Sequence, residues 1–421
     1  MEVSYNVRYQ KSNFSSKVLI DKEGEIIIYG KGFRLKGKGA QDKGELINFS
    51  EIKEFYFNDD KILFITFNKE KYSISDSGTL FDQMLIDIYK ARNEFLMDAL
   101  FMKGGKLRAE YEGDYQRLSK FGKLISKGDA KLRLYERSLI VVPETSDAFS
   151  IHYDFVNYHE FDEMEYNLKI VMDDGTNMFF SGLGNDFEFF QEKMNELLGG
   201  MYETLVNDIL KRAFPEFHAA TLLKLGYKMK GGKAVSLKDL QKMDKDLAVA
   251  VDKFIFEDEK FAENVKPLRE LTNEHEIFYG IARDDAVKGS YIRWVMFAVP
   301  SKNIVGFSIL PRWQEGGAKD QNHQHEMYFF KIIMEQGNAA EKTEDKIREV
   351  DEALVTLNFT KDPCYKDKRE LRHSPYQYAI RKLPFLRILR KSYVGKISSS
   401  DKNEWKTKLD EIFKNAMLPS E

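Results

Sequence analysis

Two histidines separated by one residue, with an acidic residue beside them, are the first candidates for chemistry in this chain. His323, His325 and Glu326 stand at the start of an apolar run typical of a strand. Alternate residues of a strand face the same way, so both imidazoles could bind one metal ion with a third ligand, as in a metal-dependent hydrolase. The turn signal at 320–322 instead favours a solvated strand entrance, and two ligands do not complete a site.

A second candidate is the basic stretch 361–396, in which eleven Lys or Arg stand against three acidic residues, a local net charge of +8. Cations interleaved with tyrosines can grip phosphates and stack on bases. They can equally form a solvated helix face that answers acidic surfaces of the same chain, such as 161–165 or 257–263. The residues expected to contact an anionic partner are Arg369, Arg372, Arg381, Arg387, Arg390 and Lys391.

A glycine-rich segment at 226–234 approaches the pattern of a phosphate-binding loop. An extra glycine displaces the lysine, and Ala234 stands where a Ser or Thr would hold magnesium. We therefore interpret the segment as a flexible basic turn. Cys364 has no cysteine partner, so no complete catalytic set is found and no cofactor is expected.

The elements that would position these residues are clearest in the stretch 47–101. Apolar alternation predicts strands on either side of turns at 58–60 and 68–70, followed by an amphipathic helix that Thr79 can cap. We expect the helix to bury three residues, which are Phe81, Met84 and Ile88. Before this stretch, 17–38 is typical of a hairpin with a turn at 21–24, and a linker is expected from 103 to 113.

The same pattern returns about a hundred residues later. Residues 153–156 correspond to 49–52 at an offset of 104, and the helix that begins at Phe187 corresponds to the one at Phe81 at an offset of 106. The order and length of the elements agree although identity is low, which indicates domain duplication. The second helix is expected to bury Phe187, Phe190 and Met194.

A strand-rich half-barrel closed by one helix, with 49–55 leading into an Asp-Asp turn, resembles the pleckstrin-homology-like superfold over residues 18–101 and 119–200. The resemblance implies seven-stranded bent barrels, each plugged by its helix, and a function in binding lipids, peptides or partner proteins. It also singles out Lys31, Arg34 and Lys36, which approximate the basic pattern of lipid-binding members. These cations can equally be a solvated strand edge that blocks aggregation.

The second half of the chain changes period. Helical spacing dominates to about residue 270, and four apolar runs then predict strands at 276–282, 291–299, 304–310 and 326–334. Helices are expected at 343–357, 376–390 and 403–413. The sequence thus predicts an α+β multidomain chain with domains at 1–108, 109–212, 213–270 and 271–421.

Composition bounds the function. The chain has 421 residues, 43% hydrophobic content and a formal net charge of -3, so several folded domains are expected and no whole-protein field favours nucleic acid or membrane. A single cysteine and the lack of an apolar leader or spanning segment favour the cytoplasm. The leading hypothesis is a non-enzymatic scaffold that binds a protein partner through the tandem domains, and the alternatives are the hydrolase or a binder of anionic lipid or nucleic acid.

Overall fold

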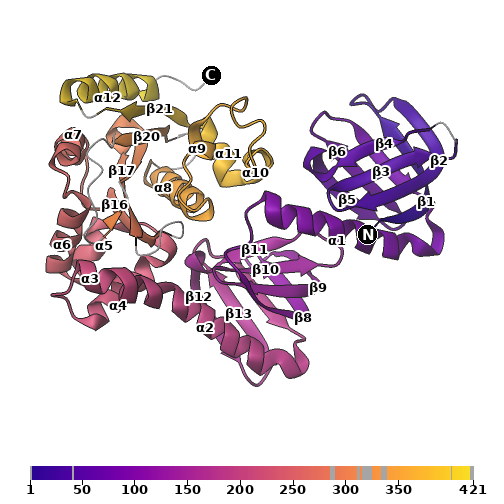
Figure 1. Cartoon of the computed structure of the whole chain (residues 1–421), viewed down its shortest axis with the longest axis horizontal. Helices are drawn as coiled ribbons and strands as arrows, with labels where there is room; N and C mark the ends of the chain where they lie inside the picture. Colours follow the sequence, from indigo (N-terminus) through magenta and orange to yellow (C-terminus); the bar gives the residue numbers. More distant parts are fainter. Residues whose placement is uncertain are drawn as a thin grey trace. The chain divides into compact units, whose positions relative to one another are not determined.

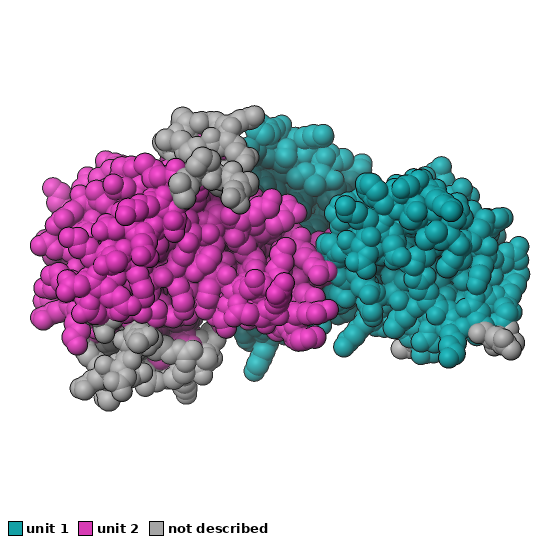
Figure 2. All heavy atoms as spheres, turned by 90° about the horizontal axis from the view of Figure 1, so that it is seen from above, with its two compact units in different colours: residues 1–193 teal, residues 194–421 magenta. Residues whose placement is uncertain are grey.

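The computed structural model describes residues 2–39, 42–284, 290–310, 313–314, 325–332, 339–399 and 401–417. The chain is an α+β protein with three antiparallel sheets, and it divides into two compact units, residues 1–193 and 194–421 (Figure 2). Within the described residues, no helix combines the length and apolar character needed to cross a membrane. We describe each unit by itself.

The first repeat of unit 1 is a curled seven-stranded antiparallel sheet (Figure 1), with strand order β4-β3-β2-β1-β7-β6-β5. Its strands and the following helix share one apolar core. The strands are β1 (Val3–Ser12), β2 (Val18–Tyr29), β3 (Gly32–Gly37), β4 (Glu45–Asn48), β5 (Ile52–Asn58), β6 (Lys61–Thr66) and β7 (Lys71–Ser75). Helix α1 (Phe81–Ala99) follows them. The strands and helix predicted for 47–101 are confirmed.

The predicted turn at 21–24 is wrong, because β2 runs through it without a break. Gly24 pairs with Val7 on one side and Gly37 on the other, and a Cβ built on it would lie 2.0 Å from the Lys36 carbonyl oxygen. The glycine therefore permits a close approach of strands and does not make a turn. Strand β1, which lies in the middle of the sheet, was not predicted from the sequence.

The second repeat has the same topology, with strand order β11-β10-β9-β8-β14-β13-β12. The strands are β8 (Leu107–Leu118), β9 (Leu124–Tyr135), β10 (Ser138–Pro143), β11 (Phe149–His152), β12 (Val156–Asp162), β13 (Asn167–Met172) and β14 (Asn177–Ser181). Helix α2 (Phe187–Leu205) follows. The 3-10 turns Phe49–Glu51 and Tyr153–Phe155 precede β5 and β12, as the offset of 104 predicts. Because β8 begins at Leu107, the expected linker at 103–113 is mostly strand.

Both helices bury the predicted residues, since Met84, Ile88, Phe190 and Met194 are each 0% exposed, and Phe81 and Phe187 are also buried. Thr79 does not cap α1. It lies inside the 3-10 turn Gly78–Leu80, and the α-helix begins only at Phe81.

The second half of α1 belongs to both repeats. The Arg92 guanidinium lies 5.2 Å from the centroid of the Phe55 ring of the first repeat and forms a forked pair with Asp147 of the second, at 2.6 and 2.8 Å. The buried Asn93 amide donates to the carbonyls of Pro143 and Ser146, and its oxygen accepts from the Ala148 N–H. A fully satisfied buried amide fixes one orientation of its partners.

In unit 2 the sheet follows the order β15-β16-β17-β18-β20-β21, and β19 pairs with β17. The strands are β15 (Val235–Ser236), β16 (Ile277–Arg283), β17 (Ser290–Val299), β18 (Ile304–Ile309), β19 (Trp313–Gln314), β20 (Glu326–Lys331) and β21 (Tyr393–Ser398). All ten residues of β17 are buried, as expected for a central strand covered on both faces.

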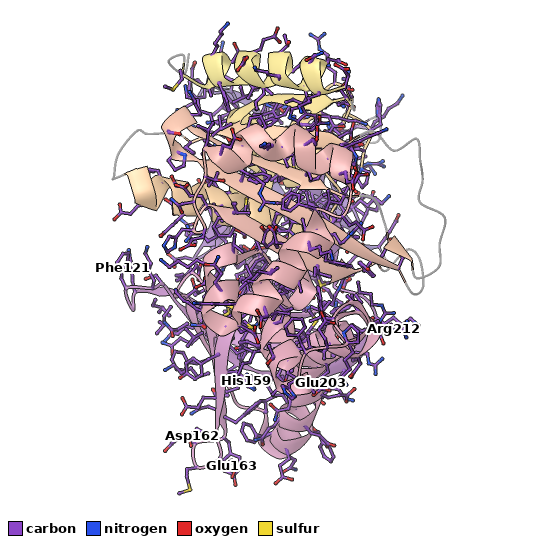
Figure 3. All side chains as sticks on the ribbon, turned by 90° about the vertical axis from the view of Figure 1, so that its left-hand side faces the viewer. Phe121, His159, Asp162, Glu163, Glu203 and Arg212 are labelled. Atoms are coloured by element: carbon purple, nitrogen blue, oxygen red, sulfur yellow. The ribbon has the colours of Figure 1, made fainter. Side chains whose placement is uncertain are left out.

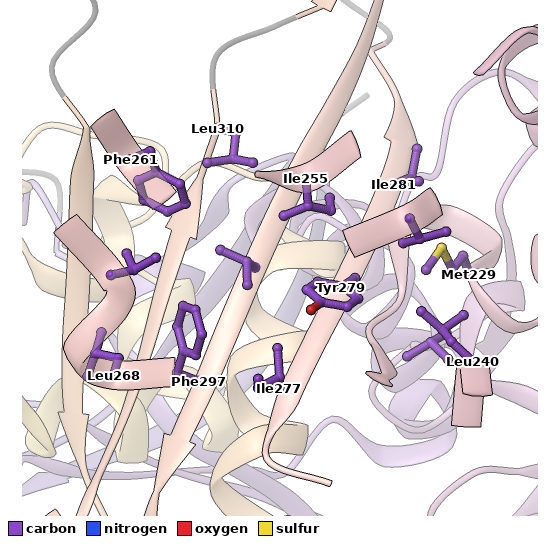
Figure 4. Packing of buried hydrophobic residues seen from close by; sticks show 14 of the residues in the cluster. Met229, Leu240, Ile255, Phe261, Leu268, Ile277, Tyr279, Ile281, Phe297 and Leu310 are labelled. Atoms are coloured by element: carbon purple, nitrogen blue, oxygen red, sulfur yellow. The ribbon is translucent and has the colours of Figure 1, made fainter. Parts of the chain in front are cut away.

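Helices cover both faces of this sheet (Figure 1). On one face, α4 (Ala219–Lys228), α5 (Leu237–Met243), α6 (Lys245–Ile255), α7 (Glu259–Glu270) and α12 (Lys402–Met417) share a core with the strands. Figure 4 shows part of that core, with Leu268 near Phe297. Against the other face lie α8 (Ala339–Thr356), α9 (Asp362–Tyr365), α10 (Ala379–Lys382) and α11 (Pro384–Lys391). The helix predicted at 376–390 is broken before Pro384.

The glycine-rich segment at 226–234 is a packed turn and not a flexible one. Gly231 and Gly232 adopt positive φ, and the Gly232 carbonyl accepts a 2.8 Å hydrogen bond from the Trp294 indole. A Cβ on Gly232 would lie 2.5 Å from the Phe359 ring, and Lys230 is buried. The glycines are there because backbone and rings approach closely.

We expect Phe190→Ala to lower the free energy of unfolding by about 3 to 5 kcal/mol, because the change leaves a cavity in the core of the second repeat. The neighbouring Phe189 is 65% exposed and provides a matched control, for which we expect a change below about 0.5 kcal/mol. Urea unfolding of both variants measures the difference. Equal losses would show that Phe190 does not fill a core.

We expect Asn93→Ala to cost about 2 to 4 kcal/mol, since it leaves the buried Ala148 N–H and two carbonyls without the side chain that pairs them. Thermal unfolding of the full chain measures the loss. Asn403→Ala, at an exposed position of α12, is the control. A melting temperature unchanged in both variants would contradict a coupling role for Asn93.

Candidate functional site

The structure brings Glu326 together with two lysines of the basic stretch. The Glu326 carboxylate is paired with Lys361, accepts from Lys396 at 3.1 Å and accepts from the Tyr328 hydroxyl at 2.6 Å. The Tyr365 ring is tilted by 40° against the Tyr328 ring with 4.7 Å between centroids, and the Lys396 ammonium lies 5.4 Å from the Tyr365 centroid. Strands β20 and β21 supply three of these residues, and Lys361 and Tyr365 lie at the two ends of α9.

Electrostatics lock this cluster in one charge state. Partial burial favours the neutral acid, but hydrogen bonds from Lys361, Tyr328 and Lys396 outweigh it and lower the pKa of Glu326 to about 2. Burial, and then the adjacent carboxylate, raises the pKa of the Tyr328 phenol. A carboxylate so firmly ionised is a poor proton acceptor at neutral pH, so the geometry does not suit Glu326 to act as a general base.

The His325 side chain does not join the Glu326 cluster but lies against Asp258 and Phe261. It is 5% exposed, its Nε2 is 3.3 Å from Asp258 Oδ2, and its ring lies 5.1 Å from the Phe261 ring. His323 falls outside the described residues. Within the described ranges, no three His, Cys, Asp or Glu side chains are grouped as a metal site would need. The metal hypothesis therefore stays a prediction that depends on His323.

The cations of the basic stretch divide into two groups. Lys361 and Lys396 hold Glu326, and Lys366 pairs with Asp362 at 2.8 Å. Arg390 donates to the carbonyls of Pro363 and Lys366 at 2.7 and 2.6 Å, so it fastens α11 to α9 and does not face a partner. Lys382 Nζ lies 5.9 Å from the centroid of the Tyr378 ring. Besides Lys396, the exposed members are Lys368, Arg369, Arg372, Arg381, Arg387 and Lys391.

The three cations of the first repeat do not converge. Lys31 lies in the turn between β2 and β3 and is exposed. The Arg34 guanidinium lies 5.8 Å from the centroid of the Tyr29 ring, and Lys36 pairs with Glu25 at 3.4 Å on the neighbouring strand. Two of the three thus contact their own sheet.

Sequence reasoning missed the two most exposed phenylalanines of unit 1, which lie at the tips of the first hairpin of each repeat. Phe14, between β1 and β2, is 69% exposed, and Phe121, between β8 and β9, is 85% exposed. Figure 3 shows Phe121 at the end of its hairpin. Exposed apolar neighbours follow each ring, which are Val18 and Leu19 in one repeat and Leu124 and Ile125 in the other. We call these two segments, 13–19 and 119–125, the hairpin tips.

The two hairpin tips are built alike. In each tip, the side chain of the first loop residue accepts a hydrogen bond from the backbone N–H of the fifth. Asn13 accepts from Lys17 at 3.0 Å, and Ser119 accepts from Lys123 at 3.2 Å. The fourth residue has positive φ in both, 63° at Ser16 and 75° at Gly122. These local bonds define the loop shape, so the exposed rings sit on ordered turns.

The comparisons with known proteins are sparse. No family model matches the chain, and no curated protein matches it. Among solved structures, one that matches is described as the structure of the Spt16D Pob3N heterodimer. It shares 11% identity with a TM-score of 0.16, and the match covers 41% of this chain and 86% of that chain. The topology above therefore rests on this chain's own strand pairing.

A sequence signal for the hairpin tips does exist. Each tip holds one Phe among Ser, Asn, Gly and Lys residues, with two aliphatic residues directly after Lys17 in the first tip and after Lys123 in the second. Polar loop residues satisfy the turn, whereas a large ring there has no role in the loop's own hydrogen bonds. At the offset of 106 the loop residues and the aliphatic pairs correspond, whereas the rings differ by one position, since Phe14 corresponds to Lys120 and Phe121 to Ser15.

We expect Glu326→Gln to destabilise the chain by about 2 kcal/mol at neutral pH, because two lysines lose their countercharge. The folded pKa of Glu326 is depressed, so its stabilisation is present above the ordinary value of 4.5 and is lost as pH falls toward about 2. The difference from wild type should therefore shrink below pH 4.5. Urea unfolding at neutral pH and below pH 4.5 measures the difference in unfolding free energy, with Glu270→Gln at an exposed site as control.

Proposed function

We propose that this chain is a non-enzymatic interaction protein whose first unit binds a protein partner through the hairpin tips. We further infer that its two repeats are tandem pleckstrin-homology-like domains. The support is a seven-stranded antiparallel sheet of the same order in each repeat, followed by one helix that buries apolar residues. That is the architecture which the superfold implies, and its members serve mostly in binding.

The observation that carries the proposal is the pair of exposed phenylalanines, Phe14 and Phe121. Leaving a large ring in water forgoes about 1.5 to 3 kcal/mol that burial would supply. Aromatic residues that dock into a partner's pocket commonly dominate an interface. The recurrence of the same ordered loop in both repeats supports a shared role in binding.

The positive charge beside the rings indicates the charge expected on the partner's surface. Lys69 Nζ lies 5.1 Å from the Phe14 centroid, and Lys120 Nζ lies 5.1 Å from the Phe121 centroid. Lys17 and Lys123, next in each loop, are exposed. A complementary protein surface would have an apolar pocket rimmed by carboxylates, since opposite charges at the rim steer association.

The hydrolase alternative depends on His323, which lies outside the described residues. Elemental analysis of the purified protein tests it directly. Stoichiometric zinc or another transition metal that is lost on His323→Ala would favour the enzyme over the scaffold.

The experiment is quantitative capture of partners from native lysate by wild type, by Phe14→Ser/Phe121→Ser and by Phe189→Ser. The last removes a ring that is 65% exposed but lies outside the hairpin tips, so it controls for loss of any surface phenylalanine. We expect a partner that is lost with the double variant and retained by the control. With that partner purified, the double variant should raise Kd by about 10- to 100-fold.

Two outcomes would contradict the proposal. One is a partner that all three proteins capture equally, which would place the interface elsewhere. The other is sedimentation with lipid vesicles that depends on Phe14 and Phe121 in the absence of any protein partner, which would make the hairpin tips a membrane contact.

A further inference from the structure

We propose that unit 2 binds a nucleic acid through a separate surface formed by the exposed cations around α10 and α11. We call this surface the cationic face, and its members are Lys368, Arg369, Arg372, Arg381, Arg387 and Lys391. It is distinct from the hairpin tips in both position along the chain and chemistry. The proposal therefore does not depend on the protein partner of unit 1.

The fold holds the cationic face in place from beneath. Leu371, Ile380, Leu386 and Leu389 are buried, and each lies within a few residues of an exposed cation. Helix α11 contacts α8, α9 and α10. The two hydrogen bonds from Arg390 join α11 to the backbone at Pro363 and Lys366, so the cations of α11 and of the turn after α9 share one support.

Few acidic groups within the segment oppose this charge. Asp362 pairs with Lys366, which is outside the cationic face. The two exposed carboxylates, Asp367 and Glu370, accept from the backbone N–H groups of Arg369 and Asp367. Six exposed cations thus stand against two carboxylates that are already engaged in the turn. Lys361, Lys366, Arg390 and Lys396 have partners within the unit, and Lys396 is exposed as well.

The chemistry of the cationic face favours a phosphate polymer over a lipid surface. A helix that enters a membrane interface must present its apolar side chains outward. Phe385, Leu386 and Leu389 of α11 are instead buried, and Ile388 is 37% exposed. Four of the six cations are arginines, whose planar guanidinium groups match phosphate oxygens in a forked geometry.

Binding of this kind has a diagnostic salt dependence. Each phosphate contact on a single strand adds about -0.7 to the slope of log affinity against log salt. With about four to six contacts, affinity should fall about 50- to 300-fold between about 50 and 200 mM salt. Base sequence should matter little, because contacts to the phosphate backbone do not read bases.

Fluorescence anisotropy of the full chain with a labelled single strand of about 20 nucleotides tests the inference. Two charge reversals address the cationic face from different segments, Arg369→Glu/Arg372→Glu and Arg387→Glu/Lys391→Glu. The matched control is Lys224→Glu/Lys245→Glu, which makes the same charge change at exposed positions of α4 and α6 in the same unit. Circular dichroism confirms that each variant melts as wild type does.

We expect both reversals to weaken binding at least about tenfold at about 50 mM salt and to flatten the salt slope, and the control to bind within about twofold of wild type. Three results would overturn the inference. These are no binding by wild type at low salt, equal weakening by the control, and binding to anionic vesicles but not to DNA or RNA strands. A reversal that fails to melt as wild type is replaced by the other, since the two pairs lie on different segments.

Discussion

The buried amide of Asn93 is the constraint on which the arrangement of unit 1 depends. It makes three hydrogen bonds to the turn between β10 and β11, and beside it Arg92 stacks on Phe55 while forking onto Asp147. One helix thus closes the first sheet and is bonded to the second. Polar contacts of this kind tolerate little displacement, so they specify one geometry where apolar packing alone would allow several.

Duplication explains what the repeats share, and the α1 contact shows where they differ. The hairpin tips keep the same loop bonds and the same positive φ in both repeats. At the offset of 106, however, Arg92 and Asn93 correspond to Leu198 and Gly199, which cannot form such bonds. The repeats therefore retain a common loop geometry at the hairpin tips, whereas the polar contacts of Arg92 and Asn93 belong to the first helix.

The spacing of apolar residues and the turn residues were enough to predict most elements. Ile62, Phe64 and Ile74, for example, are buried at alternate strand positions as the pattern requires. Gly24 misled the interpretation of β2, because a glycine required for close strand approach looks in sequence like a glycine required for a turn. The role of Arg390 was equally hidden. Its partners are backbone carbonyls, which carry no side-chain signal, and its distance from them is set by the packing of α11 on α9.

The basic stretch shows why a charge count differs from a binding surface. Lys361 and Lys396 both pair with the Glu326 carboxylate, which comes from a strand distant in sequence. Arg390 donates to a backbone carbonyl of the same chain. What remains outward is set by which side of α11 packs inward, since Leu386 and Leu389 are buried and Arg387 and Lys391 are not. Apolar burial thus decides which cations face solvent. The six cations of the cationic face, less Asp367 and Glu370, carry +4 of the stretch's net charge of +8.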